Sequence, residues 1–283
     1  MSKVFRISVW VIGLAVSLGA ASANAGSLIE FPNLPEQAPA QLRGYLARPD
    51  AGFSGMLGSH SDRAGPYPAV LVLHGCSGIS SHSVKIADRL GSWGYVSLTV
   101  DSLGPRGIAS GCGGGFRDQP FDAYAALSYL SQLDFVDPAR VAVLGQSMGG
   151  AAVLYAADRD LVAQYFKDRF RAAIAYYPGC GIPAALMTAP TLVLIGEADD
   201  WNSAERCREM VKHARTDGAA ISLIVYPGAR HAFDVAELQP GVRFLGRWVE
   251  YNEPAAKDAE EKTHAFLAAN LDGAEPGQSQ TPQ

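Results

Sequence analysis

The chain has 283 residues, of which 48% are hydrophobic and 18% are charged, and its formal net charge is −5 at pH 7. This length and apolar content suit one globular domain with a substantial buried core. The mild negative charge and the absence of a basic run argue against a nucleic-acid partner.

The N-terminus has the pattern of an export signal. Two basic residues precede an apolar stretch over residues 7–21, and "ANA" at 23–25 fits the small-x-small rule for cleavage. The alternative is a retained membrane anchor, but the apolar stretch is shorter than the roughly 20 residues that span a bilayer. We therefore predict export to the periplasm or the medium. The predicted organisation is a signal peptide over 1–25, one domain over 26–271 and a polar, disordered tail over 272–283.

Six apolar runs rich in Val, Ile and Leu lie along the mature chain, without strict alternation of polar and apolar residues. Such runs are typical of parallel strands that are covered on both faces. Helix-favouring segments alternate with them, which predicts the α/β class, with a mostly parallel sheet, right-handed crossovers and helices on both faces. The predicted strands are 68–75, 94–101, 141–145, 172–179, 191–200 and 221–228, with an edge strand at 41–49; the predicted helices are 81–93, 120–133, 147–158, 202–214 and 254–271.

The segment "VAVLGQSMGG" at 141–150 changes abruptly from a strand pattern to a helix pattern around one serine. Strand, tight turn and helix form a device that presents a nucleophile, here Ser147, at the end of a sheet strand. Gly145 and Gly149 suit this turn, because backbone segments approach each other there too closely for side chains. The alternative is that Ser147 only caps the following helix.

Two other polar residues follow predicted strands and supply what a serine nucleophile needs. Asp199 lies at the end of the fifth predicted strand along the chain, and His231 follows the sixth. A serine needs a base, and the base needs a carboxylate that orients its ring. The order serine, acid, histidine is that of α/β-hydrolases. We therefore predict Ser147, Asp199 and His231 as the catalytic residues, with Asp200 as the alternative acid.

The reaction also needs N–H donors for the oxyanion that forms when an acyl carbon is attacked. The amide of Met148 is one candidate, because it lies at the start of the helix that follows Ser147. The second donor is expected from the loop "LHGCSG" at 73–78, where the amide of Cys76 is the candidate.

Four segments together resemble the dienelactone hydrolase family of α/β-hydrolases over most of the mature chain. They are "LHGCSG", "GQSMGG", "GEADDW" and "YPGARHAFD", in this order and spacing. The resemblance implies the α/β-hydrolase fold and a catalytic triad of Ser147, Asp199 and His231. Asp199 is preferred to Asp200 because the family's acid lies three residues after the glycine that ends the strand, here Gly196.

The chain departs from dienelactone hydrolases proper at two places. It has Ser147 where they use a cysteine nucleophile, and its oxyanion loop reads His74-Gly75 where theirs carries a glutamate. With the export signal, these features resemble secreted or periplasmic members that act as general carboxylesterases.

Further residues near strand ends are candidates for substrate contact. The resemblance to members that bind acidic lactones implies that Arg106 binds a substrate carboxylate; the alternative is an ion pair with Asp101 or another nearby carboxylate. Trp201, Tyr177 and Phe233 are candidates for an apolar acyl pocket, with packing against the sheet as the alternative for each.

The histidines other than His231 receive simpler interpretations. His74 is predicted to shape the oxyanion loop rather than to transfer protons. The others have no pattern of partners and are predicted to be exposed: His60, His82, His213 and His264.

All four cysteines follow the signal, so an exported chain could form two disulfides. Three pairings are open. We favour Cys180 with Cys207, because each follows a predicted strand by a short distance, and Cys76 with Cys112 by elimination. The alternative is four buried thiols. No cysteine or histidine spacing suggests a metal site.

Together these features predict an exported serine hydrolase that cleaves small-molecule carboxylic esters or lactones through an acyl-enzyme. No cofactor and no stable membrane anchor are expected. The alternatives are an acyltransferase or peptidase that uses the same triad, and a catalytically silent binding protein with the same fold. The oligomeric state and the acyl chain length stay open.

Overall fold

The computed structural model describes residues 26–35, 37–49, 66–114 and 116–272. The signal peptide predicted over 1–25 lies outside the described residues, as does all but the first residue of the predicted tail. Within the described ranges, no helix is both long enough and apolar enough to cross a bilayer.

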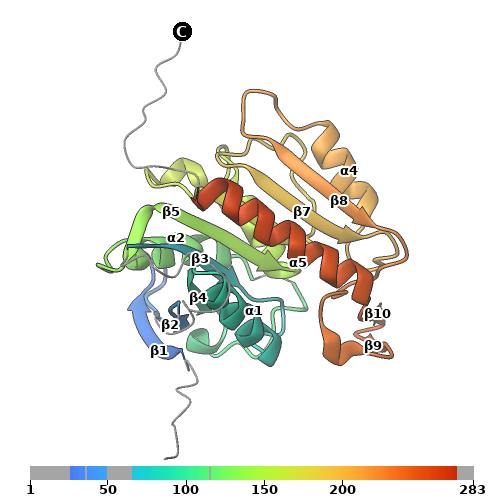
Figure 1. The fold of residues 1–283 in the computed structure, drawn as a ribbon, viewed down its shortest axis with the longest axis horizontal. Helices are drawn as coiled ribbons and strands as arrows, with labels where there is room; N and C mark the ends of the chain where they lie inside the picture. The colour runs from blue at the N-terminus through green and yellow to red at the C-terminus, as the bar shows by residue number, and fades with distance from the viewer. Residues whose placement is uncertain (1–25, 36, 50–65, 115, 273–283) are drawn as a thin grey trace, which may run out of the picture.

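The chain forms an eight-stranded sheet with helices packed against it (Figure 1). The strand order is β1-β2-β4-β3-β5-β6-β7-β8, and all neighbouring pairs from β4 to β8 are parallel. This arrangement confirms the predicted α/β-hydrolase architecture. The strands are β1 Ser27–Pro32, β2 Gln41–Ala47, β3 Tyr67–Leu73, β4 Val96–Asp101, β5 Val136–Gln146, β6 Ala172–Tyr176, β7 Thr191–Gly196 and β8 Ile221–Tyr226.

The prediction of an edge strand at 41–49 was wrong in its position within the sheet. This segment forms β2, which pairs antiparallel with β4 on one side and with β1 on the other, so β1 is the edge strand. The sequence gives no sign of β1, because "SLIEFP" is not a continuous apolar run and only Phe31 in it is buried.

The five predicted helices are all present. Figure 1 shows α1 and α5 on the same face of the sheet, and α2 and α3 pack against each other on the opposite face. α4 packs against β7 and β8. The helices are α1 Ser81–Ser92, α2 Gln119–Leu130, α3 Met148–Ala157, α4 Ala204–Lys212 and α5 Glu253–Leu267, with shorter helical turns at Gly104–Arg106, Ala163–Tyr165, Ala236–Leu238 and Ala268–Asp272.

Polar side chains fix where three of these helices begin. Ser80, Ser203 and Asn252 each accept a hydrogen bond from the backbone amide three residues ahead, at the starts of α1, α4 and α5. Such a cap satisfies an amide that has no partner within the helix, and replacing it by alanine typically costs about 1 kcal/mol.

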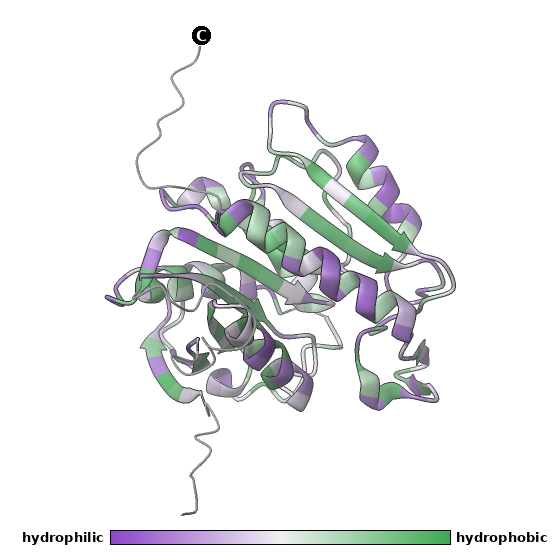
Figure 2. Cartoon of the chain, in the orientation of Figure 1, coloured by the Kyte–Doolittle hydropathy of each residue, from purple (hydrophilic) through white to green (hydrophobic). Residues whose placement is uncertain are grey.

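The core lies between the sheet and the two helix layers. Every residue of β6 and β7 is buried, and Figure 2 shows hydrophobic strands next to an α5 that carries many hydrophilic residues. The buried residues of α5 recur at every fourth position, so one stripe of this helix faces the sheet while the rest faces solvent. They are Ala255, Ala259, Thr263 and Leu267.

A small hairpin after His231 has no counterpart in the sequence prediction. It consists of β9, Val242–Phe244, and β10, Arg247–Val249, with Phe244 paired to Arg247. The two residues between the strands, Leu245 and Gly246, both have positive φ angles, 50° and 81°, which is the geometry of a tight hairpin turn. Its strands are three residues long, too short to give a period in the sequence.

Both disulfides favoured from the sequence are present. Cys76 is bonded to Cys112, and Cys180 to Cys207. The first joins the loop after β3 to the segment before α2, and the second joins the loop after β6 to α4. The alternative of four buried thiols was therefore wrong.

Candidate active site

Three side chains from distant parts of the chain form one hydrogen-bonded row. His231 Nε2 lies 2.9 Å from Ser147 Oγ, and His231 Nδ1 lies 2.8 Å from Asp199 Oδ2. The His231 and Asp199 side chains are 4% and 0% exposed. The histidine and the carboxylate are therefore buried, Ser147 is half-buried, and each ring nitrogen has one partner in the row.

The backbone at Ser147 has the conformation of a strained turn. Ser147 has φ 54° and ψ −113°, immediately after β5 and before α3, and its amide donates to Tyr176 O at 2.9 Å. A Cβ atom on Gly145 would lie 2.2 Å from Gly149 O, and one on Gly149 would lie 2.2 Å from Leu73 O. Only glycine fits at these two positions, so the sequence itself dictates the turn that exposes the serine.

The second carboxylate oxygen of Asp199 has its own partners. Asp199 Oδ1 accepts hydrogen bonds from the amides of Trp201 and Asn202, both at 2.8 Å. These bonds fix the carboxylate while Oδ2 faces His231. Asp200 points elsewhere: its carboxylate accepts from the amide of Trp248, and its carbonyl from Arg247. The structure thus brings Asp199, and not Asp200, to the histidine.

The two candidate oxyanion donors flank the serine. Met148 is the first residue of α3, so its amide has no partner within the helix. Cys76 lines the same cavity as Ser147. Its carbonyl accepts from the amide of Gly111 at 2.8 Å, and its sulfur is bonded to Cys112. The loop that carries the Cys76 amide is therefore tied to the rest of the fold in two ways.

His74 lies at the start of this loop and fixes its backbone through hydrogen bonds. It is fully buried, its Nε2 accepts from the amide of Ser102, and its Nδ1 lies 2.7 Å from Gly75 O. Burial lowers the pKa of His74, so the ring is neutral and carries its proton on Nδ1. This geometry agrees with the role in loop structure that the sequence suggests.

A cavity of about 270 Å³ opens over Ser147 and His231. Two aromatic rings predicted near the site border it: Trp201 stacks on His231 with centroids 5.1 Å apart, and Tyr177 meets the same ring edge-on at 4.7 Å. Phe233 does not line the cavity. It is fully buried against Tyr177 and two other tyrosines, so packing is its role.

Arg106 lies away from the position expected of a substrate clamp. Its Nη1 and Nη2 donate to Asp122 at 2.8 Å each, and Nη1 also donates to Ser102 O. Asp122 is fully buried, and a buried carboxylate without a cation would be costly. Burial raises the pKa of Asp122 even though Arg106 opposes that shift. The structure contains the alternative from the sequence, an ion pair with nearby carboxylates, and the partners are Asp122 and, at 3.5 Å, Asp118 rather than Asp101.

The prediction that His82 is exposed was wrong. Its Nε2 lies 3.0 Å from Asp234 Oδ2 and 2.8 Å from Gln146 Nε2, and the side chain is 15% exposed. Gln146 Nε2 also donates to Asp234 Oδ2 at 2.7 Å, and the Tyr177 hydroxyl donates to Asp234 Oδ1 at 2.8 Å. We refer to His82, Gln146, Tyr177 and Asp234 as the Asp234 network.

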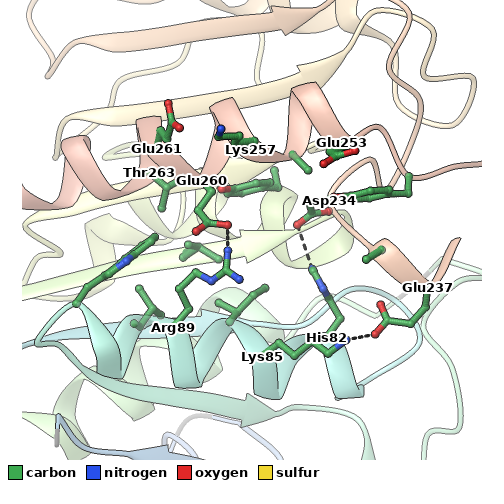
Figure 3. A pocket seen from close by; sticks show the side chains of 18 residues that line it. His82, Lys85, Arg89, Asp234, Glu237, Glu253, Lys257, Glu260, Glu261 and Thr263 are labelled. Atoms are coloured by element: carbon green, nitrogen blue, oxygen red, sulfur yellow. Dashed lines mark hydrogen bonds and ion pairs between the residues drawn. The ribbon is translucent and has the colours of Figure 1, made fainter. Parts of the chain in front are cut away.

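His82 and Asp234 shift each other's pKa in the direction that favours the charged form of each. Burial lowers the pKa of His82, but the hydrogen bond and charge of Asp234 outweigh it and leave the pKa raised. Burial likewise raises the pKa of Asp234, but His82 and Tyr177 outweigh it and leave the pKa lowered. Figure 3 shows His82 of α1 pointing toward Asp234, beside a second ion pair between Lys85 and Glu237.

The sequence predicts that three histidines besides His82 are exposed, and it suggests no metal site. His213 and His264 lie on the surface as predicted; His213 Nδ1 bonds to Glu209 O, and His264 stacks on Trp93. His60 lies outside the described residues. Within the part of the chain that the structure describes, no three His, Cys, Asp or Glu side chains are grouped to hold a metal ion.

Known proteins resemble this chain in sequence and in fold. The sequence model of the dienelactone hydrolase family matches residues 114–271. A putative carboxymethylenebutenolidase of Synechocystis is 26% identical over 82% of this chain and 93% of its own length. A probable 2-oxo-3-(5-oxofuran-2-ylidene)propanoate lactonase of Bradyrhizobium is 28% identical, over 67% and 77%. The crystal structure of a putative dienelactone hydrolase from Klebsiella pneumoniae has a TM-score of 0.62 at 21% identity, over 86% of this chain and 99% of that one.

Proposed function

This chain belongs to the dienelactone hydrolase family, and from that premise we propose that it cleaves small-molecule carboxylic esters or lactones through an acyl-enzyme on Ser147. The family gives the class of enzyme, a carboxylic ester hydrolase. The observation that carries the finer proposal is the row in which Ser147 Oγ, His231 and Asp199 are joined at 2.9 and 2.8 Å.

In the first half of the reaction, Ser147 Oγ attacks the acyl carbon while His231 Nε2 takes the hydroxyl proton. Asp199 holds the ring so that Nδ1 carries a proton, and it stabilises the imidazolium. The amides of Met148 and Cys76 donate to the oxyanion. His231 then returns the proton to the departing alcohol oxygen, which leaves an ester on Ser147.

In the second half, a water molecule replaces the alcohol. His231 takes a proton from this water, whose oxygen attacks the acyl carbon, and the proton returns to Ser147 Oγ as the acid departs. Both halves thus use His231 Nε2 first as the base and then as the acid.

The test pairs a substrate panel with a probe. Wild type, Ser147→Ala and Ser131→Ala are assayed on p-nitrophenyl esters from acetate to octanoate and on one dienelactone, and each protein is treated with a fluorophosphonate. Ser131 is a matched control: it follows the last residue of α2, does not line the cavity, and its half-buried hydroxyl donates to the Leu127 carbonyl. We expect Ser147→Ala to lose roughly 10³-fold or more in kcat/KM and all labelling, while the control keeps both. Labelling of another residue would assign the nucleophile elsewhere, and no labelling of folded wild type would favour a silent binding protein; either outcome would refute the proposal.

Export is part of the same proposal. The pattern of residues 1–25 supports it, and two disulfides suit an oxidising compartment. Fractionation of cells that express the full chain, with mass spectrometry of the mature N-terminus, tests it: the expected first residue is Gly26.

A further inference from the structure

Apart from its histidines, the cavity over Ser147 is lined by uncharged side chains, and the ring of His82 is already paired with Asp234. Among the described residues that border it, none is Asp, Glu, Lys or Arg, and its titratable lining consists of His82, His231 and Tyr177. A carboxylate or ammonium group that entered such a cavity would lose its hydration without gaining a free partner of opposite charge, which disfavours its binding. The lining therefore discriminates against charged substrates.

The β9–β10 hairpin supplies much of the apolar wall. Val242, Phe244 and Val249 line the cavity, and Phe244 packs on Trp201 with ring centroids 5.9 Å apart. Val242 and Phe244 are nevertheless 46% and 41% exposed. Large apolar side chains that border a cavity and remain open to solvent are typical of a surface that a ligand covers. Figure 1 places the hairpin near the end of the sheet toward which β7 and β8 point.

The position of His231 indicates which part of the substrate meets the hairpin. The departing alcohol oxygen must lie within hydrogen-bonding reach of His231 Nε2, so the alcohol part of the ester lies on the histidine side of the cavity. Val249 forms a β-bridge with His231. The Trp201 ring stacks on the His231 ring and also contacts the ring of Phe244. The hairpin is therefore the wall next to the alcohol part.

The guanidinium expected to attract an acidic substrate is already engaged. Arg106 forms two hydrogen bonds to the buried Asp122, and its side chain is 12% exposed. Releasing Arg106 toward a ligand would leave the Asp122 charge buried without its cation, which is strongly unfavourable. Arg106 is therefore not available to bind a substrate carboxylate in the cavity.

From these observations we infer the substrate class: uncharged esters whose apolar alcohol part lies on the β9–β10 hairpin, with Phe244 and Val242 as the residues that set the preference. This inference rests on the proposed esterase function. It excludes acidic lactones and other substrates with a free carboxylate near the scissile bond as good substrates.

One experiment varies the alcohol part alone. Acetates of linear alcohols, from methyl to octyl, all give the same acetyl-enzyme, so differences in kcat/KM report the acylation step. We expect kcat/KM to rise roughly three- to fourfold for each added methylene until the cavity is filled. In Phe244→Ala and Val242→Ala the rise per methylene is smaller. Leu245→Ala is the control, because Leu245 lies at the hairpin tip, is 65% exposed and does not line the cavity.

A second experiment varies charge at constant size. Hydrolysis of 3-acetoxypropanoate is compared with that of 3-acetoxypropanamide, which has the same shape without the charge. We expect the amide to be preferred by roughly tenfold or more in kcat/KM. Equal rates, or a preference for the carboxylate, would overturn the inference.

The remaining outcomes separate this inference from the proposed function. If acetates are hydrolysed without dependence on the alcohol, or if Phe244→Ala keeps the full dependence, the inference fails while the esterase proposal stands. If no acetate is hydrolysed but the fluorophosphonate labels Ser147, the substrate class is wrong and the nucleophile is right. If neither occurs, both fail.

Discussion

In the part of the chain that the structure describes, a buried pair, Asp199 with His231, and a partly buried pair, Asp234 with His82, differ in what the histidine can reach. In the first pair, Asp199 bonds to Nδ1 of His231, which leaves Nε2 free to face the Ser147 hydroxyl. In the second, Asp234 and the Gln146 amide both lie against Nε2 of His82. A carboxylate–histidine pair is suited to proton transfer only if the remaining nitrogen meets a nucleophile, so the second pair is suited to holding structure.

The second pair is nevertheless connected to the first. Gln146 is the residue before Ser147, and Tyr177, whose hydroxyl donates to Asp234, packs edge-on against the His231 ring. Asp234 itself lies three residues after His231 in the chain. The Asp234 network thus holds the backbone before the nucleophile and a wall of the histidine pocket, which makes its members positioning residues.

The largest expected effect comes from breaking the first pair. Asp199→Asn should lower kcat by roughly 10³- to 10⁴-fold, because the amide can favour the wrong tautomer of His231. Steady-state kinetics on p-nitrophenyl acetate measures this loss, and circular dichroism checks the fold. Asp200→Asn is the matched control and should keep most activity. The opposite ranking of the two variants would assign the acid to Asp200.

Breaking the second pair should reduce stability more than activity. Asp234→Asn places an amide donor or a weakened acceptor against Gln146, His82 and Tyr177, and a buried mismatch of this kind costs about 1–3 kcal/mol. We expect that loss in urea unfolding, with kcat reduced by about tenfold or less. Asp258→Asn is the control: its carboxylate also accepts a tyrosine hydroxyl, at 2.9 Å, but is 43% exposed. A kcat loss as large as that of Asp199→Asn would mean that the second pair takes part in the chemistry.

The smallest expected effect is a dependence of stability on pH. The raised pKa of His82 means that its contribution is fully present below about pH 6.5 and is lost as the pH rises through the raised value. The lowered pKa of Asp234 means that its contribution is present above about pH 3.9 and is lost as the pH falls through the lowered value. The pair therefore stabilises the fold most between these limits.

Denaturant unfolding of wild type and His82→Gln at pH 5.5 and 8.5 measures this effect. The stability advantage of the wild type should be greater at pH 5.5. An advantage that is equal or greater at pH 8.5 would contradict the assigned direction.

The sequence by itself determined the parts of this protein that depend on local pattern. Continuous apolar runs predicted the parallel strands, and two glycines around Ser147 predicted a turn that no other residue fits. Because parallel strands end at the same edge of the sheet, the positions of Asp199 and His231 after their strands predicted that they approach Ser147.

Only the tertiary structure decided the partners of residues without such a pattern. His82 and Asp234 are 152 positions apart, and neither lies in a motif that points to the other. Arg106 had several carboxylates within reach, and it forms its two shortest carboxylate contacts with the buried Asp122, while the more exposed Asp118 lies 3.5 Å from its Nε. The β9–β10 hairpin is too short to show a period. For the two ion pairs the deciding quantity is desolvation, which depends on what surrounds a side chain in space and not on its neighbours in the chain.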